Sequence, residues 1–380
     1  MLKDKTAIAG IGQTAFAKHL EPSEKQLACE AIVAALADAG IDPSEVDAFS
    51  SYTMEETDEV DIAKNIGAGD VTFFSQVGYG GGAGCGTVGH LAMAIATGQA
   101  NVGVAWRSRK RGSGPRPWSN TTRMLPAPAQ WTRPWGLLRP VDEIAMLTRR
   151  YIHEYGATRD HLANVALAVR SHANRNPAAI MHERPLTREE YMSARWISEP
   201  LCLFDNCLET DGALACVVVS AERAKDCPNP LAYIHSFGQG IPPLHHTMVN
   251  YWCEDPLMGP SWACAKALWR NADFTAADVK VAQLYDAFTP LIPLSLEGYG
   301  FCRRGEGASF TDDGAIALGG RLPVNTSGGG LSEAYVHGFN LIVEGVRQMR
   351  GTSTAQVEGA DTCLVTSGEG VPTSALLLRR

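Results

Sequence analysis

A glycine-rich turn that opens a helix is the first place in this chain where chemistry is expected. The stretch from Gly78 to Gly98 follows a short β-type run at 71–75 and precedes a second run at 101–106. Many α/β enzymes present a nucleophile on such a strand, turn and helix, at the helix N-terminus. The apex of this turn is Gly80-Gly81-Gly82, which offers no serine, cysteine or lysine. The turn therefore predicts either a site without the usual nucleophile or a glycine-rich loop packed against a neighbour.

Two similar series of strands and helices surround this turn. Each series spans about 150 residues, a typical domain size, and the elements follow the same order in both. We therefore predict a duplicated α/β chain with an N-terminal half at 1–230 and a C-terminal half at 231–380. Strands that alternate with helices indicate parallel or mixed sheets.

An inserted region at about 107–200 interrupts the first half. It opens with arginines interleaved with proline, glycine and tryptophan. Because Trp118, Trp131 and Trp135 are large apolar side chains, we expect them to be buried and the region to be folded.

Composition excludes several classes of function. The formal net charge is −8, which disfavours nucleic acid as a partner. The sequence contains no apolar run of about 18 residues, so no membrane span is predicted. The 10 cysteines include no CxxC pair, and no signal peptide is recognised at the start. These features predict free thiols in a reducing cytoplasm.

Three motifs in order carry a family resemblance. They are Gly10-Ile11-Gly12-Gln13-Thr14-Ala15-Phe16, Thr210-Asp211-Gly212-Ala213 and Asn325-Thr326-Ser327-Gly328-Gly329. Across nearly its whole length the chain resembles the thiolase superfamily, in particular the sterol-carrier-protein-type thiolases. The resemblance implies a five-layered αβαβα fold with helices at 83–97 and 335–349 between two sheets. It also implies a two-fold dimer that forms through the strand at 101–106.

The departures from the thiolase pattern point to a different reaction. The position of the nucleophilic cysteine falls on Gly82, and two catalytic loop positions fall on Tyr285 and Tyr335. This combination resembles the lipid-transfer-protein-like steroid side-chain aldolases. That resemblance implies retro-aldol cleavage of a 17-hydroxy-steroid 20-carboxyl-CoA into a 17-ketosteroid and propionyl-CoA. It also implies a small OB-fold zinc-ribbon partner, with which the dimer forms a heterotetramer.

Retro-aldol cleavage needs a base, an acid and a sink for electrons. Tyr285 and Tyr335 are the candidate base and acid, and the residues do not decide which is which. The sink is the thioester itself, as an enolate held by backbone N–H groups near Gly82 and Gly368. A glycine at position 82 would also leave room for a ring system. CoA is then part of the substrate, and neither a cofactor nor a metal is expected.

Several other residues are candidates for support. Asp286 either orients Tyr285 or caps the next helix. His337 either assists the third loop or is structural, and His245 and His246 are candidates for a pantetheine channel. Arg107, Arg109, Lys110 and Arg111 either bind CoA phosphates or form a solvated surface. Three alternatives stay open: core tyrosines, a noncatalytic lipid- or acyl-CoA-binding protein, and a residual thiolase that uses Cys85.

Overall fold

The computed structural model describes residues 2–114 and 127–380. The strands are β1 (Thr6–Gln13), β2 (Ala48–Tyr52), β3 (Phe73–Val77), β4 (Val102–Lys110), β5 (Trp196–Ser198), β6 (Leu201–Cys202), β7 (Asp211–Ser220), β8 (Ala232–Gly240), β9 (Val281–Gln283), β10 (Thr362–Ser367) and β11 (Thr373–Arg379). The helices are α1 (Glu24–Ala39), α2 (Glu59–Ile66), α3 (Gly84–Ala96), α4 (Ala127–Thr132), α5 (Pro140–Tyr155), α6 (Arg159–Ala173), α7 (Arg188–Ser193), α8 (Ala221–Ala224), α9 (Pro260–Arg270), α10 (Leu291–Gly298) and α11 (Phe339–Arg350).

The main sheet repeats one pairing scheme in its two parts. Its order is β3-β2-β4-β7-β1-β8-β11-β10-β9. β1 lies antiparallel to β7, β7 antiparallel to β4, and β4 parallel to β2. In the same way β8 lies antiparallel to β11, β11 antiparallel to β10, and β10 parallel to β9. Among the described strands, the two parts pair with each other where Ala7 lies opposite Tyr233 and Ile8 opposite Ala232.

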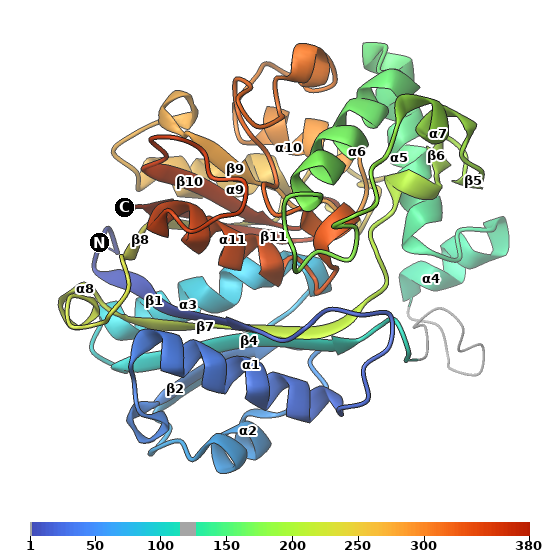
Figure 1. Cartoon of the computed structure of the whole chain (residues 1–380). Coiled ribbons are helices and arrows are strands. Elements are labelled where there is room, and N and C mark those ends of the chain that lie inside the picture. The colour runs from blue at the N-terminus through green and yellow to red at the C-terminus, as the bar shows by residue number, and fades with distance from the viewer. Residues whose placement is uncertain (1, 115–126) are drawn as a thin grey trace.

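Helices separate and cover the two parts of the sheet (Figure 1). α1 packs on β1, β4 and β7 from outside, and α9 packs on β8 and β11. α3 and α11 contact strands of both parts and form the central layer. Because α3 is sandwiched, it needs small residues: a Cβ on Gly89 would lie 2.3 Å from the Phe237 ring. The predicted α/β fold with five layers is confirmed.

Helix α11 begins later than the sequence suggested. We expected a helix at 335–349, but it starts at Phe339. His337 and Gly338 both have positive φ, at 50° and 77°, which a continuing right-handed helix does not allow. Tyr335 is therefore on the loop that precedes the helix.

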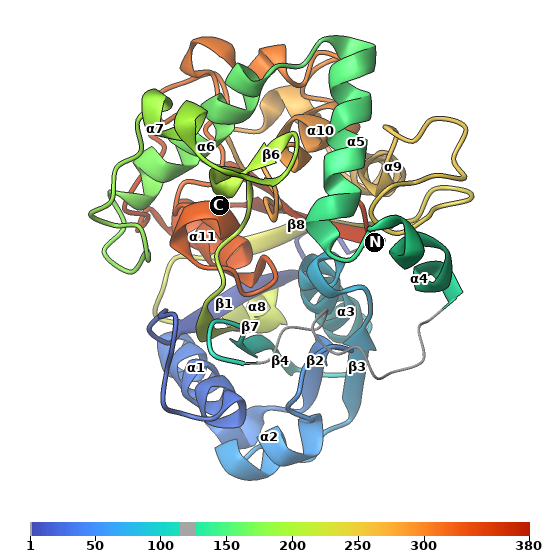
Figure 2. The same cartoon turned by 90° about the vertical axis from the view of Figure 1, so that its right-hand side faces the viewer.

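The inserted region covers one end of the sheets. Helices α5, α6 and α7 lie over the C-terminal part, and α4 projects beside α5 (Figure 2). The expectation of buried tryptophans is wrong for two of them: Trp131 is 77% exposed and Trp135 is 85% exposed, because α4 and the turn after it stand away from the core. Trp118 lies outside the described residues.

The expected dimer strand is not at an edge. β4 has β2 on one side and β7 on the other, so it has no free edge with which to pair another chain. β3 is the edge strand of that part of the sheet, and Phe74 on it is 70% exposed. Within the described ranges, every helix is too short or too polar to cross a membrane.

Candidate active site

The first tyrosine follows a buried parallel strand. Because β9 and β10 are parallel, the loops after them leave the same edge of the sheet. The backbone N–H of Tyr285 donates to the Thr366 hydroxyl at 3.0 Å. The side chain of Asn325 holds the preceding residue, since it accepts from Leu284 N at 2.7 Å and donates to Leu284 O at 2.8 Å. Asn325, the first residue of the third sequence motif, therefore fixes the loop that carries Tyr285.

The second tyrosine is positioned by the Thr-Asp-Gly-Ala motif. The backbone N–H of Tyr335 donates to the Thr210 hydroxyl at 3.0 Å. The two phenol oxygens, on Tyr285 and Tyr335, then lie 2.5 Å apart in hydrogen-bond contact. These two residues were the predicted acid and base, and the structure brings them together.

The two phenols differ in their surroundings. Burial raises the pKa of Tyr285 well above its usual value, and the neighbouring Tyr335 raises it further. Burial also raises the pKa of Tyr335, but Arg111 and Arg107 oppose this. The Arg111 guanidinium lies 5.7 Å from the centre of the Tyr335 ring. The protein thus disfavours the ionised form of Tyr335 less than that of Tyr285.

Both tyrosines line a cavity of about 320 Å³. Gly81 is in its wall, and a Cβ there would lie 1.9 Å from the Tyr285 hydroxyl. The glycine turn therefore makes room for a tyrosine hydroxyl. Other residues that line this cavity include His337, Cys207, Glu369, Phe288 and Arg111.

The expected backbone oxyanion donors are not in this wall. Gly82 donates its N–H to Tyr79 O at 3.1 Å, and a Cβ on Gly82 would lie 1.8 Å from Pro372 O. Gly368 packs against Gly82 itself. Neither glycine lines the cavity, and no room for a ring system exists at Gly82. Their neighbours Gly80, Gly81 and Glu369 do line the cavity, so an oxyanion hole of backbone N–H groups near Gly82 and Gly368 stays a prediction, without Gly82 itself as a donor.

Two cysteines give no activated nucleophile. Cys85 is fully buried and does not line this cavity, and burial raises its pKa to about 12. Cys207 lines the cavity wall, but burial raises its pKa to about 12 as well. A thiol of that pKa is protonated at neutral pH and is a poor nucleophile.

Most of the expected phosphate-binding residues are used elsewhere. Arg107 is fully buried and pairs with Glu55 at 2.8 Å. Arg109 is buried beside Glu24, with 3.8 Å between the charged groups. Lys110 donates to the carbonyls of Leu20 and Pro22. The reason is that β4 continues through Lys110. Only Arg111 of the four faces a cavity.

The supporting acid and histidines also need correction. Asp286 neither orients Tyr285 nor caps α10. Its carboxylate accepts from Gly330 N at 2.7 Å, which ties the loop that carries Tyr285 to the loop that carries Tyr335. Burial raises its pKa to about 6. His245 bonds Asn250 at 2.6 Å and His246 stacks on Tyr251, and neither lines the cavity that holds the two tyrosines. His337 does line the small cavity.

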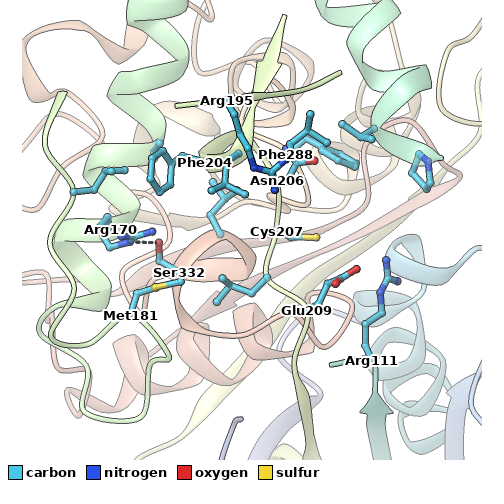
Figure 3. Close-up of a pocket in the computed structure, with 18 of the residues that line it drawn as sticks. Arg111, Arg170, Met181, Arg195, Phe204, Asn206, Cys207, Glu209, Phe288 and Ser332 are labelled. Atoms are coloured by element: carbon cyan, nitrogen blue, oxygen red, sulfur yellow. Dashed lines mark hydrogen bonds between the residues drawn. The ribbon is translucent and has the colours of Figure 1, made fainter. Parts of the chain in front are cut away.

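A larger cavity of about 480 Å³ adjoins the first. The two share Arg111, Pro140, Cys207 and Phe288 in their walls. Figure 3 shows Arg170 and Ser332 on one side of it and Arg111 on the other. Cationic side chains around it are Lys18, Arg111, Arg139, Arg170 and Arg195.

Two of these wall residues, Cys207 and Arg195, belong to no motif that was singled out, and Glu369 directly follows the candidate Gly368 but was not itself chosen. They meet at the cavities only through the tertiary fold.

Comparisons with known proteins agree with this arrangement. The Thiolase C-terminal domain-like family model matches residues 245–378. A monomeric SCP2-thiolase-like protein type 1 from Mycobacterium smegmatis superposes with a TM-score of 0.74 at 21% identity, over 99% of this chain and 78% of that chain. The fold is therefore thiolase-like.

Closer relatives define the family. The chain is 47% identical to a 17-hydroxy-3-oxo-4-pregnene-20-carboxyl-CoA lyase of Mycobacterium tuberculosis, over 100% of both chains. It is 47% identical to a steroid side-chain-cleaving aldolase of Thermomonospora curvata, over 100% of this chain and 98% of that one. A solved structure described as the Ltp2-ChsH2(DUF35) aldolase matches with a TM-score of 0.96 and 46% identity, over 100% and 98% of the chains. The chain belongs to the family of thiolase-like steroid side-chain aldolases.

Proposed function

We propose that this protein is a carbon–carbon lyase that cleaves a 17-hydroxy-steroid 20-carboxyl-CoA into a 17-ketosteroid and propionyl-CoA. The observation that carries the proposal is the pair of phenol hydroxyls, 2.5 Å apart, at a cavity whose thiol, on Cys207, is not activated. The full-length identity to a lyase with this kind of substrate supports the choice of steroid and thioester.

The reaction follows from proton positions. A phenolate takes the proton of the 17-hydroxyl, whose oxygen becomes the ketone oxygen. The bond between C17 and C20 breaks, and its electron pair passes into the thioester as an enolate. A phenol then returns a proton to C20, which gives propionyl-CoA. Because the thioester is the electron sink, the proposed reaction uses no cofactor.

The environments of the phenols assign the two roles. Tyr335 is the proposed base because the positive charges of Arg111 and Arg107 oppose the rise that burial causes in its pKa, so its ionised form is disfavoured less than that of Tyr285. Tyr285 is the proposed acid because burial and the neighbouring phenol disfavour its ionised form. The short bond between the hydroxyls lets one proton pass from one phenol to the other.

The larger cavity is the proposed place for the CoA moiety. Ligand sites commonly have volumes of 300–1,000 Å³, and the two cavities fall in this range. Arginines suit phosphates because they donate in pairs. Arg195 is exposed at the cavity, and Arg170 is fixed by Ser332 at 2.9 Å.

A partner subunit and a dimer are part of the proposal. The matched solved structure is described as a complex with a DUF35 component, so we expect this chain to bind an OB-fold zinc-ribbon partner of that kind. The exposed Trp131 and Trp135 are candidates for coverage by it. A two-fold dimer through the β3 edges would join the sheets of two chains and yield a heterotetramer. The free cysteines suit a reducing cytoplasm.

Mass spectrometry of products tests the function. The protein, produced with a DUF35 partner, is mixed with a panel of acyl-CoAs that differ in ring system and in the 17-hydroxyl. We expect ketone and propionyl-CoA from the 17-hydroxy-steroid thioester only. Binding of that thioester without products would favour a noncatalytic binding protein, and thiolysis of a 3-ketoacyl-CoA would favour a residual thiolase.

A further inference from the structure

His337 is locked in one tautomer by a buried arginine. The Nη2 and Nε groups of Arg107 both point at Nδ1 of His337, at 2.9 and 3.2 Å. An arginine can only donate, so Nδ1 must accept with its lone pair. A neutral imidazole that accepts at Nδ1 carries its proton on Nε2.

The surroundings also keep this imidazole neutral. Burial lowers the pKa of His337 well below its usual value, and Arg107, Arg109 and Arg111 lower it further. The contact between Arg107 and His337 is held in place because Arg107 is fully buried and pairs with Glu55. The ring is also stacked on Tyr52, with centroids 6.2 Å apart.

The protonated nitrogen is available to a ligand. His337 lines the small cavity, and its ring stands edge-on to Tyr335 with centroids 5.4 Å apart. Across residues 2–114 and 127–380, Nε2 of His337 makes no hydrogen bond. It is also not one of the unpaired polar atoms that are closed off from solvent. We infer that Nε2–H is open to the cavity beside the two phenols.

An enolate oxygen needs such a donor. The expected donor at Gly82 is occupied by Tyr79 O. A fixed neutral donor in a dry site stabilises developing negative charge without reorganising.

We propose that the Nε2–H of His337 donates to the thioester oxygen as it becomes an enolate. This inference rests on the proposed aldolase function and adds to it a residue that binds the reacting oxygen. Arg107 is the positioning residue that fixes the tautomer.

Two substitutions separate the donor from the structure. His337→Asn keeps an acceptor near Nδ1 for Arg107 and removes the donor at Nε2. His337→Gln places an amide N–H near Nε2. His153→Asn, on an exposed part of α5, is the matched control. Thermal melts of all variants, with the partner present, report folding.

The measurement is enolisation of the product, separate from bond cleavage. Propionyl-CoA is incubated with the enzyme in D₂O. A base removes one C2 proton, the electron pair moves to the thioester oxygen, and a deuteron returns to C2. Deuterium in propionyl-CoA is read by mass spectrometry, and steroid cleavage is measured in parallel.

We expect His337→Asn to lose about 100-fold or more in both assays, the usual scale for removing one such donor. His337→Gln should retain activity within about tenfold of the native enzyme, and His153→Asn should be unchanged. Near-native exchange in His337→Asn overturns the inference but leaves the aldolase function intact. Equal losses in the Asn and Gln variants, with normal melts, also overturn it. Failure of the unaltered enzyme in both assays would overturn the function and the inference together.

Discussion

The two neighbouring cavities differ in the kind of polar group they hold. The smaller is lined by two phenols, an imidazole and a carboxyl group, all of them buried. The larger is ringed by arginines, of which Arg195 and Arg139 are partly or largely exposed. Arg111 lies in the wall that the two cavities share, so one fixed positive charge reaches the phenols while the other arginines line the larger cavity alone. The difference indicates that the chemistry and the binding of the anionic part of the substrate are separable by mutation.

The largest expected effect is the loss of either phenol of the smaller cavity. Tyr285→Phe and Tyr335→Phe each remove one hydroxyl and little volume. We expect kcat to fall by about 100-fold or more, since a general acid or base contributes about 10²–10⁴-fold. Single-turnover kinetics measure the chemical step directly.

Thermal melts distinguish this outcome from misfolding. Loss of one buried hydroxyl costs about 1–3 kcal/mol, so both variants should remain folded at assay temperature. Near-native rates in both variants would contradict the proposed division of the two cavities. Lost rates with collapsed melting temperatures would instead assign the tyrosines to the core.

The next largest effect is expected at the glycine that makes room for Tyr285. A methyl group on Gly81 would lie 1.9 Å from the Tyr285 hydroxyl, so Gly81→Ala must displace the phenol. We expect kcat to fall about tenfold or more, because catalytic groups must keep their geometry within about 0.5 Å.

Gly78→Ala is the matched control in the same turn. A Cβ there would lie 3.9 Å from the Thr53 hydroxyl, an ordinary contact. Equal rate losses in the two variants would mean that the turn, and not the position of Tyr285, limits the reaction.

Much of the fold follows from sequence patterns. The alternation of apolar strands with helices predicted a mixed α/β chain, and the small residues of α3 predicted a helix between layers. The start of α11 was missed because positive φ at His337, a non-glycine residue, leaves no pattern in the sequence. Burial of Arg107 was missed because an arginine in a basic run is normally exposed; its burial depends on Glu55, which is 52 residues away in the chain.

The candidate site was predicted only where motifs marked its loops. Tyr285 and Tyr335 lie on such loops, and their contact agrees with that prediction. Cys207 and Arg195 come from segments that carry no motif, and only the folded chain places them at a cavity. Glu369 lies next to the candidate Gly368, but no pattern shows that its side chain enters the cavity. Gly82 and Gly368 were chosen by position in a motif, but the direction of an N–H group depends on the exact turn.

A smaller effect is expected in the larger cavity. Arg195→Gln removes an exposed positive charge from its wall. We expect KM for the CoA thioester to rise several-fold to about tenfold, with kcat nearly unchanged, because the contact is made equally in ground and transition states. Steady-state kinetics over a range of substrate concentrations separate the two constants.

Arg149→Gln is the control for surface charge, since Arg149 is also exposed, pairs with Glu199 and lines neither cavity. A fall in kcat for Arg195→Gln without a change in KM would show that the larger cavity takes part in the chemistry.

The smallest expected effect concerns how stability depends on pH. Glu369, in the wall of the smaller cavity, accepts from Ser261 N at 3.1 Å, and burial raises its pKa from 4.5 to about 7. A pKa raised in the folded chain means that the folded chain holds the proton more tightly than the unfolded chain. Its contribution to stability is therefore complete below about pH 4.5 and is lost as pH rises through about 7.

Glu369→Gln should remove this part of the pH dependence. The amide oxygen of glutamine still accepts from Ser261 N, but no charge has to be buried at high pH. We expect the melting temperature at pH 8 to rise by about 2–4 °C relative to the native chain, with little change at pH 5. Glu358→Gln, at an exposed position, should leave both values unchanged. Because arginines do not titrate in this range, Arg195→Gln in the larger cavity should not alter how the melting temperature depends on pH. If the melting temperature of Glu369→Gln depends on pH as that of the native chain does, the carboxyl group of Glu369 does not have a raised pKa in the folded chain.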